Sequence, residues 1–136
     1  MILIIDDDAS IRSSLSFLLK RAGFEVNAVS GPKEALDAVH ILAPELILMD
    51  MNFTLTTSGE EGLHLLRQVK IFHPNVPVIL MTAWGSIQLA VLGMKAGAFD
   101  FITKPWNNLV LLNSVRNALK LSEQKDSEPI SRSEEI

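Results

Sequence analysis

The sequence predicts a single doubly wound α/β domain, a parallel β-sheet with helices on both faces. Short apolar runs alternate five times with longer segments whose apolar residues recur at helical spacing. Connections between parallel strands are right-handed, which leads the helices over both faces of the sheet. With 136 residues, the chain has the length of one domain and can bury a core of its own.

The predicted strands are apolar runs too short to be buried helices and rich in β-branched residues or leucine. Unbroken runs of this kind are typical of parallel strands that are covered on both faces. The last run is weaker than the others. In order, the runs comprise residues 2–5, 24–29, 46–49, 78–81 and 99–102.

The segments between and after these runs carry apolar stripes with helical spacing. Gly23 suits the left-handed position that ends the first helix, and Pro32 suits the first turn of the second. The stripe of the fourth helix predicts that it buries one face and leaves an apolar opposite face of Leu89, Leu92 and Ala96. The stripes are Ile11, Leu15, Leu18 and Ala22; Ala35, Val39 and Leu42; Leu65, Leu66 and Val69; Ile87, Ala90, Val91 and Met94; and Leu111, Leu112, Val115, Ala118 and Leu119.

Composition limits both the boundaries of the domain and its partners. From Ser122 onward the chain has few apolar residues and no periodicity, which predicts a domain over 1–121 followed by a linker or disordered tail over 122–136. The absence of cysteine excludes disulfides, thiolate metal sites and a cysteine nucleophile. A net charge of −4 without a basic cluster argues against direct contact with nucleic acid. Without a membrane span or signal peptide, we expect a cytoplasmic protein.

Polar residues follow four of the predicted strands. Ligands of open α/β sheets bind outside the carboxyl ends of the strands, so these residues are expected to converge although they are far apart in sequence. Asp8 is the exception, since it suits the cap of the following helix. The strand-end residues are Asp6, Asp7 and Asp8; Asp50 and Asn52; Thr82; and Lys104.

Converging carboxylates repel one another unless a cation lies between them, and Mg²⁺ prefers oxygen ligands. Mg²⁺, a lysine, a hydroxyl and a further carboxylate suit phosphoryl transfer, in which the carboxylate itself can be the nucleophile. Asp50 is the candidate nucleophile, because it stands alone at the end of a central strand. Any one of these residues alone is more often structural, and the combination favours the functional interpretation.

At these residues the sequence resembles the receiver domain of two-component response regulators. The resemblance covers Met1 to about Leu121 and rests on four motifs. It implies a flavodoxin-like (βα)5 fold with strand order 2-1-3-4-5. The motifs are Ile-Leu-Ile-Ile-Asp-Asp-Asp, Leu-Ile-Leu-Met-Asp50, Val-Ile-Leu-Met-Thr82-Ala83, and Lys95-Ala-Gly-Ala-Phe-Asp-Phe-Ile-Thr-Lys104-Pro105.

The resemblance also implies a role for each matching residue. Asp50 would be the phosphoacceptor, and Asp6 and Asp7, with the backbone carbonyl of Asn52, would complete a Mg²⁺ site. Thr82 and Lys104 would follow the phosphoryl group. Phe101 would be the switch aromatic, and the Lys104–Pro105 bond would be cis.

The same resemblance implies a phosphoryl-accepting switch that catalyses only its own phosphorylation and dephosphorylation. A sensor histidine kinase would supply the phosphoryl group, and a C-terminal output domain, absent from this chain, would receive the signal. Apolar residues outside the core of the fourth and fifth helices, together with the fifth strand between them, predict a surface for self-association or for the output domain. On the fifth helix these residues are Leu109, Val110 and Leu121.

One segment departs from the family pattern. The loop over 53–61 is a few residues longer than usual and lacks the Met-Pro that normally follows the phosphoacceptor. With Trp84 and Trp106, this loop is similar to the receivers of sigma-54-dependent transcriptional activators.

Three other functions remain open from the sequence. A flavodoxin-type binding module would need a phosphate-cradling first loop, which Asp6, Asp7 and Asp8 would disfavour. A phosphohydrolase with an aspartyl phosphate would need an acid two residues after its nucleophile, where Asn52 stands. A pseudo-receiver that only dimerises would not need its site positions filled. The histidines, His40, His64 and His73, show no metal-triad spacing and are interpreted as solvated or packing residues.

Overall fold

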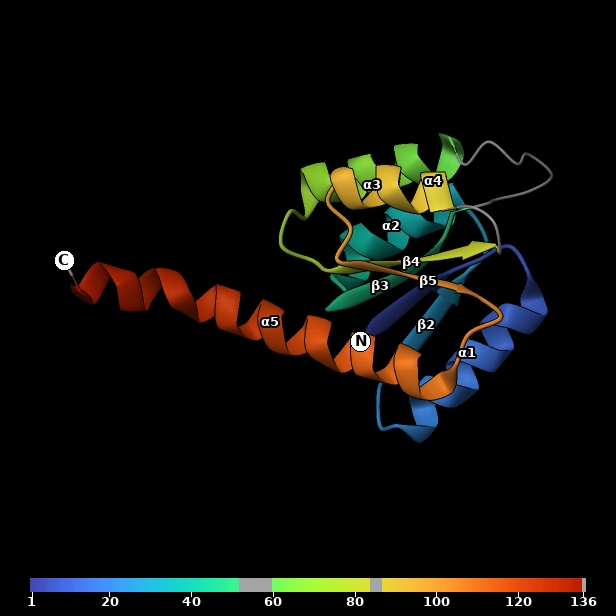
Figure 1. Cartoon of the computed structure of the whole chain (residues 1–136), viewed down its shortest axis with the longest axis horizontal. Coiled ribbons are helices and arrows are strands. Elements are labelled where there is room, and N and C mark those ends of the chain that lie inside the picture. Colours follow the sequence, from blue (N-terminus) through green and yellow to red (C-terminus); the bar gives the residue numbers. More distant parts are fainter. Residues whose placement is uncertain (52–59, 84–86, 136) are drawn as a thin grey trace.

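The computed structural model describes the backbone of residues 1–51, 60–83 and 87–135, and the side chains of 1–51, 61–82 and 87–122. Its strands form one parallel sheet in the order β2-β1-β3-β4-β5, which confirms the predicted order (Figure 1). The observed strands are β1 (Ile2–Ile5), β2 (Val26–Val29), β3 (Leu46–Asp50), β4 (Val78–Ala83) and β5 (Asp100–Lys104).

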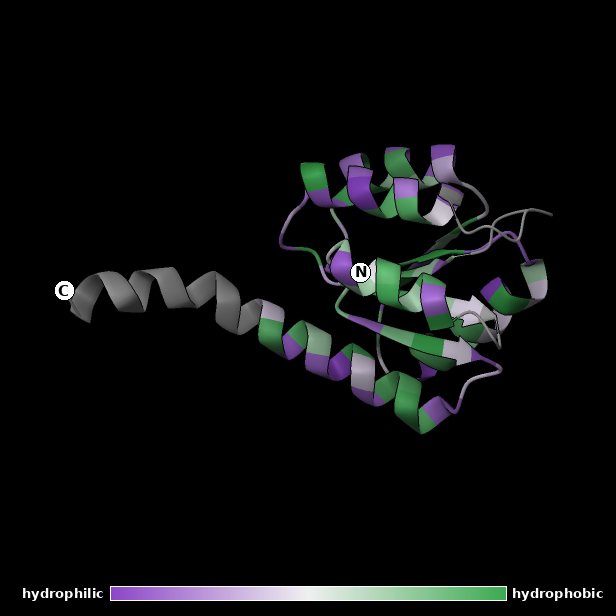
Figure 2. Ribbon diagram, turned by 45° about the horizontal axis from the view of Figure 1, so that its top comes forward, coloured by the Kyte–Doolittle hydropathy of each residue, from purple (hydrophilic) through white to green (hydrophobic). Residues whose placement is uncertain are grey.

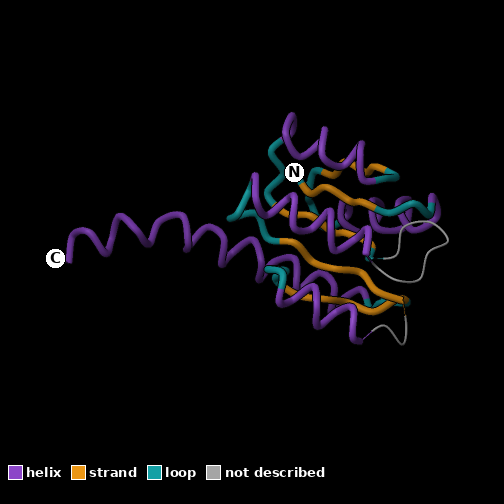
Figure 3. The backbone as a smooth tube through the Cα atoms, turned by 90° about the horizontal axis from the view of Figure 1, so that it is seen from above, coloured by secondary structure: helices purple, strands orange, loops and turns teal. Residues whose placement is uncertain are grey.

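Helices cover both faces of this sheet, as predicted. The helices form two groups that pack on opposite faces, so that the strands form the middle layer (Figures 1 and 3). The first group is α1 (Ala9–Arg21) and α5 (Asn108–Glu135), and the second is α2 (Pro32–Leu42), α3 (Glu60–Phe72) and α4 (Ile87–Lys95).

The core consists of two apolar clusters, one under each helical layer. Neighbouring residues of a strand point to opposite faces, so Ile4 packs with α1 and α5 whereas Leu3 packs with α2 and α3. All four residues of β1 and all five of β3 are buried, as expected for central parallel strands. Figure 2 shows the same pattern, since the strands are mostly hydrophobic and the helices carry mixed faces.

The ends of α1 and α2 carry the capping, glycine and proline residues expected from the sequence, with one exception. Asp8 caps α1 by accepting hydrogen bonds from the amides of Ser10 and Ile11, and Gly23 has the positive φ predicted for it. Pro32 begins α2. The exception is Ala43, which ends α2 with a φ of 46° although it is not glycine. Leu42, placed in the buried stripe of this helix by its spacing, is 42% exposed.

The predicted orientation of α4 was right for Ala90, which is buried, and for Leu92, which is exposed, and wrong for the other residues of both faces. Ala90 and Gly93 are buried, and Leu89 and Ala96 pack against the core, whereas the face predicted to be buried contains the exposed Ile87, Val91 and Met94. The reason is Gly93, because a β-carbon there would overlap with Leu80 Cδ1. The missing side chain lets α4 approach β4 with its small residues inward, which turns its larger ones outward.

Helix α5 extends beyond the predicted domain. Its backbone continues to Glu135, past the boundary predicted at Leu121, and the linker role of 122–136 stays a prediction. Extending a helix whose first turns are already packed costs much less than starting one. Glutamate, glutamine and lysine in this segment favour a helix, whereas Pro129 disfavours one. The domain boundary at Leu121 stays a prediction. Among the described helices, none is both long and apolar enough to cross a membrane.

Candidate functional site

Three aspartates converge at the carboxyl edge of the sheet. Asp6 and Asp7 follow β1 and Asp50 ends β3, and these two strands are paired neighbours. Each carboxylate offers an oxygen within 4.8 Å of the others. Asp6 and Asp50 are only 1% and 3% exposed, whereas Asp7 is exposed to solvent. The sequence predicted this convergence from the strand ends alone.

Lys104 connects two of the three acids. Its Nζ lies 2.7 Å from Asp6 Oδ2 and 3.2 Å from Asp50 Oδ1, although it comes from β5, two strands away from β3. Partial burial lowers the pKa of this lysine, but the hydrogen bond to Asp6 and the charges of Asp50 and Asp6 outweigh burial and raise the pKa above its usual value. The amine therefore stays protonated and faces the carboxylates as a cation.

The loop between β1 and α1 is fixed at both ends. Asp6 Oδ1 accepts a hydrogen bond from the amide of Asp8 at 2.9 Å, and Arg12 donates to the backbone carbonyl of Asp6 at 2.8 Å. Hydrogen bonds from the Ser10 hydroxyl and amide to Asp8 lower the pKa of its carboxyl. Asp8 is thus the helix cap that the sequence predicted, and Asp7 projects between two fixed neighbours.

Thr82 and Phe101 belong to the neighbouring strands β4 and β5. Thr82 is 1% exposed and stands next to Thr103 in the register of β4 and β5, one position before the Ala83–Lys104 pair. Phe101 is half-buried and packs against the core under α2, α3 and α4. The Lys104–Pro105 bond is cis, as the resemblance implied. Asn52, Trp84 and most of the 53–61 loop lie outside the described residues.

The donor set of this edge suits a hard divalent cation. Three carboxylate oxygens converge, and nitrogen or sulfur ligands, which transition metals favour, do not join them among the described residues. Two of the acids are buried, so their mutual repulsion is weakly screened by water. Lys104 supplies one positive charge to Asp6 and Asp50. A divalent cation beside Asp7 would supply further positive charge.

Sequence reasoning missed Arg12 at this site. It lies in the first turns of α1, beside the stripe of Ile11 and Leu15, and belongs to neither that stripe nor the residues at the strand ends. The missed signal is its position just after a capped helix start, from which a long side chain can reach back to the end of β1.

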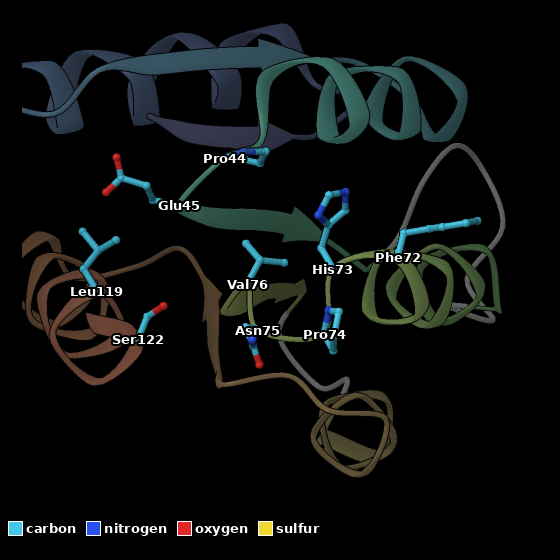
Figure 4. A pocket seen from close by; sticks show the side chains of 9 residues that line it. All are labelled: Pro44, Glu45, Phe72, His73, Pro74, Asn75, Val76, Leu119 and Ser122. Carbon is cyan, nitrogen blue, oxygen red and sulfur yellow. The ribbon is translucent and has the colours of Figure 1, made fainter. Parts of the chain in front are cut away.

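A separate groove of about 420 Å³ lies near the opposite, amino-terminal edge of the sheet. Its lining precedes β3 and β4 and includes the middle of α5, so it does not belong to the aspartate cluster (Figure 4). His73 lines it, and His40 packs edge-on against Phe72, which agrees with the packing role expected for these histidines. The lining residues are Pro44, Glu45, Phe72, His73, Pro74, Asn75, Val76, Leu119 and Ser122.

Comparison with known proteins identifies the class to which this fold and site belong. The model of the response regulator receiver domain matches residues 2–116, so the chain belongs to that family. Receiver domains of two-component response regulators accept a phosphoryl group on an aspartate. They are signalling switches rather than enzymes in the usual sense, and histidine kinases are their partners.

The individual relatives include transcriptional regulators. The chain is 35% identical over 135 residues to the transcriptional regulatory protein FixJ of Bradyrhizobium diazoefficiens, covering 99% of this chain and 62% of that protein. It is 39% identical over 104 residues to the DNA-binding transcriptional regulator NtrC of Klebsiella pneumoniae, covering 76% of this chain and 21% of that protein. The chain therefore spans only part of the length of these relatives.

A solved structure supports the same assignment. The receiver domain of NtrX from Brucella abortus matches with a TM-score of 0.83 and 32% identity, covering 88% of this chain and 98% of that one.

Proposed function

We propose that Asp50 is the phosphoacceptor of this receiver domain and that a phosphohistidine of a sensor kinase is its donor. The observation that carries the proposal is the contact of one protonated lysine with Asp50 and Asp6 in a cluster of three acids. Asp50 ends the central strand β3, and the buried carboxylate lies at the edge where open α/β sheets bind ligands.

The cation of this site would be Mg²⁺, held by Asp6, Asp7 and Asp50. Asp7 and Asp50 would be its direct protein ligands, and Asp6, whose two oxygens already accept from Asp8 and Lys104, would act mainly through water. The family resemblance adds the backbone carbonyl of Asn52. When bound, Mg²⁺ would neutralise negative charge on the phosphoryl oxygens.

The transfer itself requires little from the protein beyond position and charge. A carboxylate oxygen of Asp50 forms a bond to phosphorus while the phosphorus–nitrogen bond of the donor histidine breaks, and the departing imidazole keeps the electron pair and takes up a proton. Lys104 keeps its positive charge beside the oxygens on which negative charge gathers. Hydrolysis of the same acyl phosphate would return Asp50 to its carboxylate.

The new phosphoryl group changes the partners of the neighbouring side chains. It adds a charge of about −1.5 to −2 next to Lys104, which then exchanges a carboxylate partner for a phosphoryl oxygen. Thr82, one register position away from Lys104, would follow the phosphoryl group with its hydroxyl. Phe101 on the adjacent strand would then turn inward, and α4 would shift.

The signal would leave through the exposed apolar residues on both sides of the edge strand β5. On α4 these are Ile87, Val91, Leu92 and Met94, and on α5 they are Leu109, Val110 and Leu121. This surface would mediate homodimer formation or docking to a C-terminal output domain. Sedimentation with and without beryllofluoride, on wild type and Leu92→Glu, tests this step, and identical behaviour in all four samples would refute a role in self-association.

The output is proposed to be transcriptional. The relatives that carry further chain are named as transcriptional regulators, and the resemblance of the 53–61 loop, Trp84 and Trp106 favours a sigma-54-dependent activator. The domain over 1–121 would act in the cytoplasm. It would not touch nucleic acid itself, because its acidic and basic side chains nearly balance and it has no basic cluster.

Intact-mass measurement after incubation with Mg²⁺ and acetyl phosphate tests the phosphoacceptor. Wild type is expected to gain one phosphoryl group, and Asp50→Asn, which keeps the shape but removes the nucleophile, is expected to gain none. Asp37→Asn, on the exposed face of α2, is the matched control. Equal labelling of wild type and Asp50→Asn would show that Asp50 is not the acceptor.

A further inference from the structure

We infer that Arg12 is a positioning residue of the proposed metal site, which it serves by fixing the backbone of the loop that carries Asp6 and Asp7. This inference rests on the function proposed above. Its starting point is the 2.8 Å hydrogen bond from the Arg12 guanidinium to the backbone carbonyl of Asp6, a contact that bridges six positions of the chain.

The bond completes the hydrogen bonding of Asp6. The amide of Asp6 donates to Val29 at 3.1 Å, one carboxylate oxygen accepts from the amide of Asp8, and the other accepts from Lys104. Asp6 is 1% exposed, so its carbonyl has little access to water and depends on Arg12 for a partner. A buried carbonyl that loses its only partner among the described residues is expected to rotate toward solvent.

A rotation there would move Asp7, because the carbonyl of Asp6 belongs to the same peptide plane as the amide of Asp7. On its other side, Asp7 is followed by Asp8, which is fixed to the start of α1 through Ser10 and Ile11. Arg12 belongs to the same helix, and its own amide donates to the carbonyl of Asp8. Arg12 thus fixes the side of the loop that the helix cap does not reach.

Arg12 has two opposing effects on metal binding. The direction in which the Mg²⁺ affinity changes when Arg12 is replaced therefore shows which effect is larger. Its positive charge repels a second cation, so loss of the charge alone would strengthen Mg²⁺ binding. Loss of a fixed loop would weaken binding, because Asp7 would have to be ordered as the metal binds. We expect positioning to dominate, since the guanidinium bonds to the backbone and a weak, water-rich Mg²⁺ site depends on octahedral geometry.

The experiment measures Mg²⁺ affinity by calorimetry and amide hydrogen exchange without metal in wild type, Arg12→Met and Arg12→Lys. Arg12→Met keeps much of the side chain's apolar stem, and we expect it to bind Mg²⁺ about fivefold more weakly, the effect of one net hydrogen bond. Without metal, the amide of Asp8 should exchange faster, because its acceptor is Asp6 Oδ1. Arg12→Lys should recover part of both effects.

The matched control is Arg21→Met, which removes the same charge from the far end of α1, where Arg21 lies over the ring of Phe17. It is expected to change neither the affinity nor the exchange of Asp8. Equal or tighter Mg²⁺ binding by Arg12→Met would overturn the inference, as would faster exchange spread evenly along α1 with no change in affinity.

A parallel titration of Asp7→Ala separates this inference from the proposed function. If the Mg²⁺ affinity of Asp7→Ala equals that of wild type, the proposed ligand set is wrong. The exchange of Asp8 without metal then still decides whether Arg12 fixes the loop.

Discussion

Helices α1 and α4 contact the same sheet in opposite ways. α1 buries the large side chains of Leu15 and Leu19, and its start is bonded to the acidic loop through Asp8 and Arg12. α4 buries Ala90 and Gly93 and leaves Ile87, Val91, Leu92 and Met94 more than a third exposed. An element held by large buried side chains and hydrogen bonds resists displacement, whereas one that rests on small residues has less to lose when it shifts. The comparison supports the proposal that α1 holds the site while α4 shifts on phosphorylation.

The largest expected effect is on the core of α1. Leu19→Ala should lower the free energy of unfolding by about 2–5 kcal/mol, because a fully buried leucine leaves a cavity. Ile87→Ala on α4 removes a side chain that is 66% exposed. This substitution should change the free energy of unfolding by less than about 0.5 kcal/mol. Urea denaturation of both variants measures the difference, and similar costs for the two would remove the basis of the comparison.

A smaller effect is expected where α4 meets β4. Gly93→Ala gains about 1 kcal/mol of helix propensity but costs about 1–3 kcal/mol through overpacking against Leu80, so we expect net destabilisation. In the background of Leu80→Ala, which removes the obstructing atoms, the same substitution should become neutral or stabilising. A double-mutant cycle by urea denaturation tests this reversal of sign, and a constant effect in both backgrounds would show that Leu80 does not set the position of α4.

Activation should distinguish the two helices without any change of their sequence. With beryllofluoride and Mg²⁺, amide exchange is expected to change several-fold in α4 and little in α1, because the fully buried residues of α4 are small and those of α1 are leucines. Lys104→Ala should still accept phosphate at Asp50 but lose the change in α4, since the amine that follows the phosphoryl group is missing. Hydrogen exchange measured by mass spectrometry tests wild type and Lys104→Ala. Equal changes in α1 and α4 of wild type would contradict the proposal that α4 is the helix that shifts.

The smallest effect concerns the cap of α1. The pKa of Asp8 is lowered in the folded chain, so its charged form stabilises the fold above the ordinary carboxyl pKa of 3.8. That contribution is lost as the pH falls through the lowered pKa. Asp8→Asn keeps a capping oxygen but not the charge, so its stability should depend less on pH below about 4 than that of wild type. Thermal unfolding between pH 2 and 6 measures this difference. If the unfolding temperatures of the two proteins fell in parallel as the pH is lowered, the charge of Asp8 would not contribute to stability.

Much of the site could be predicted because its residues stand at strand ends. In a parallel sheet the carboxyl ends of all strands share one edge, so Asp6, Asp50 and Lys104 are brought together once the strands are recognised. The same holds for the helix signals, since Asp8, Gly23 and Pro32 act through bonds and dihedral angles within a few residues. These features are local, and a single sequence contains them.

Only the tertiary structure decided which face of α4 turns inward and which atoms fix Asp6. The spacing of Ile87, Val91 and Met94 on α4 fits a buried stripe, but the position of Gly93 against Leu80 is a contact between two separate elements. The bond from Arg12 to Asp6 likewise depends on how α1 packs beside β1. Hydrophobic periodicity states how much apolar surface a helix carries, whereas the closeness of approach between backbones determines which part of that surface is buried.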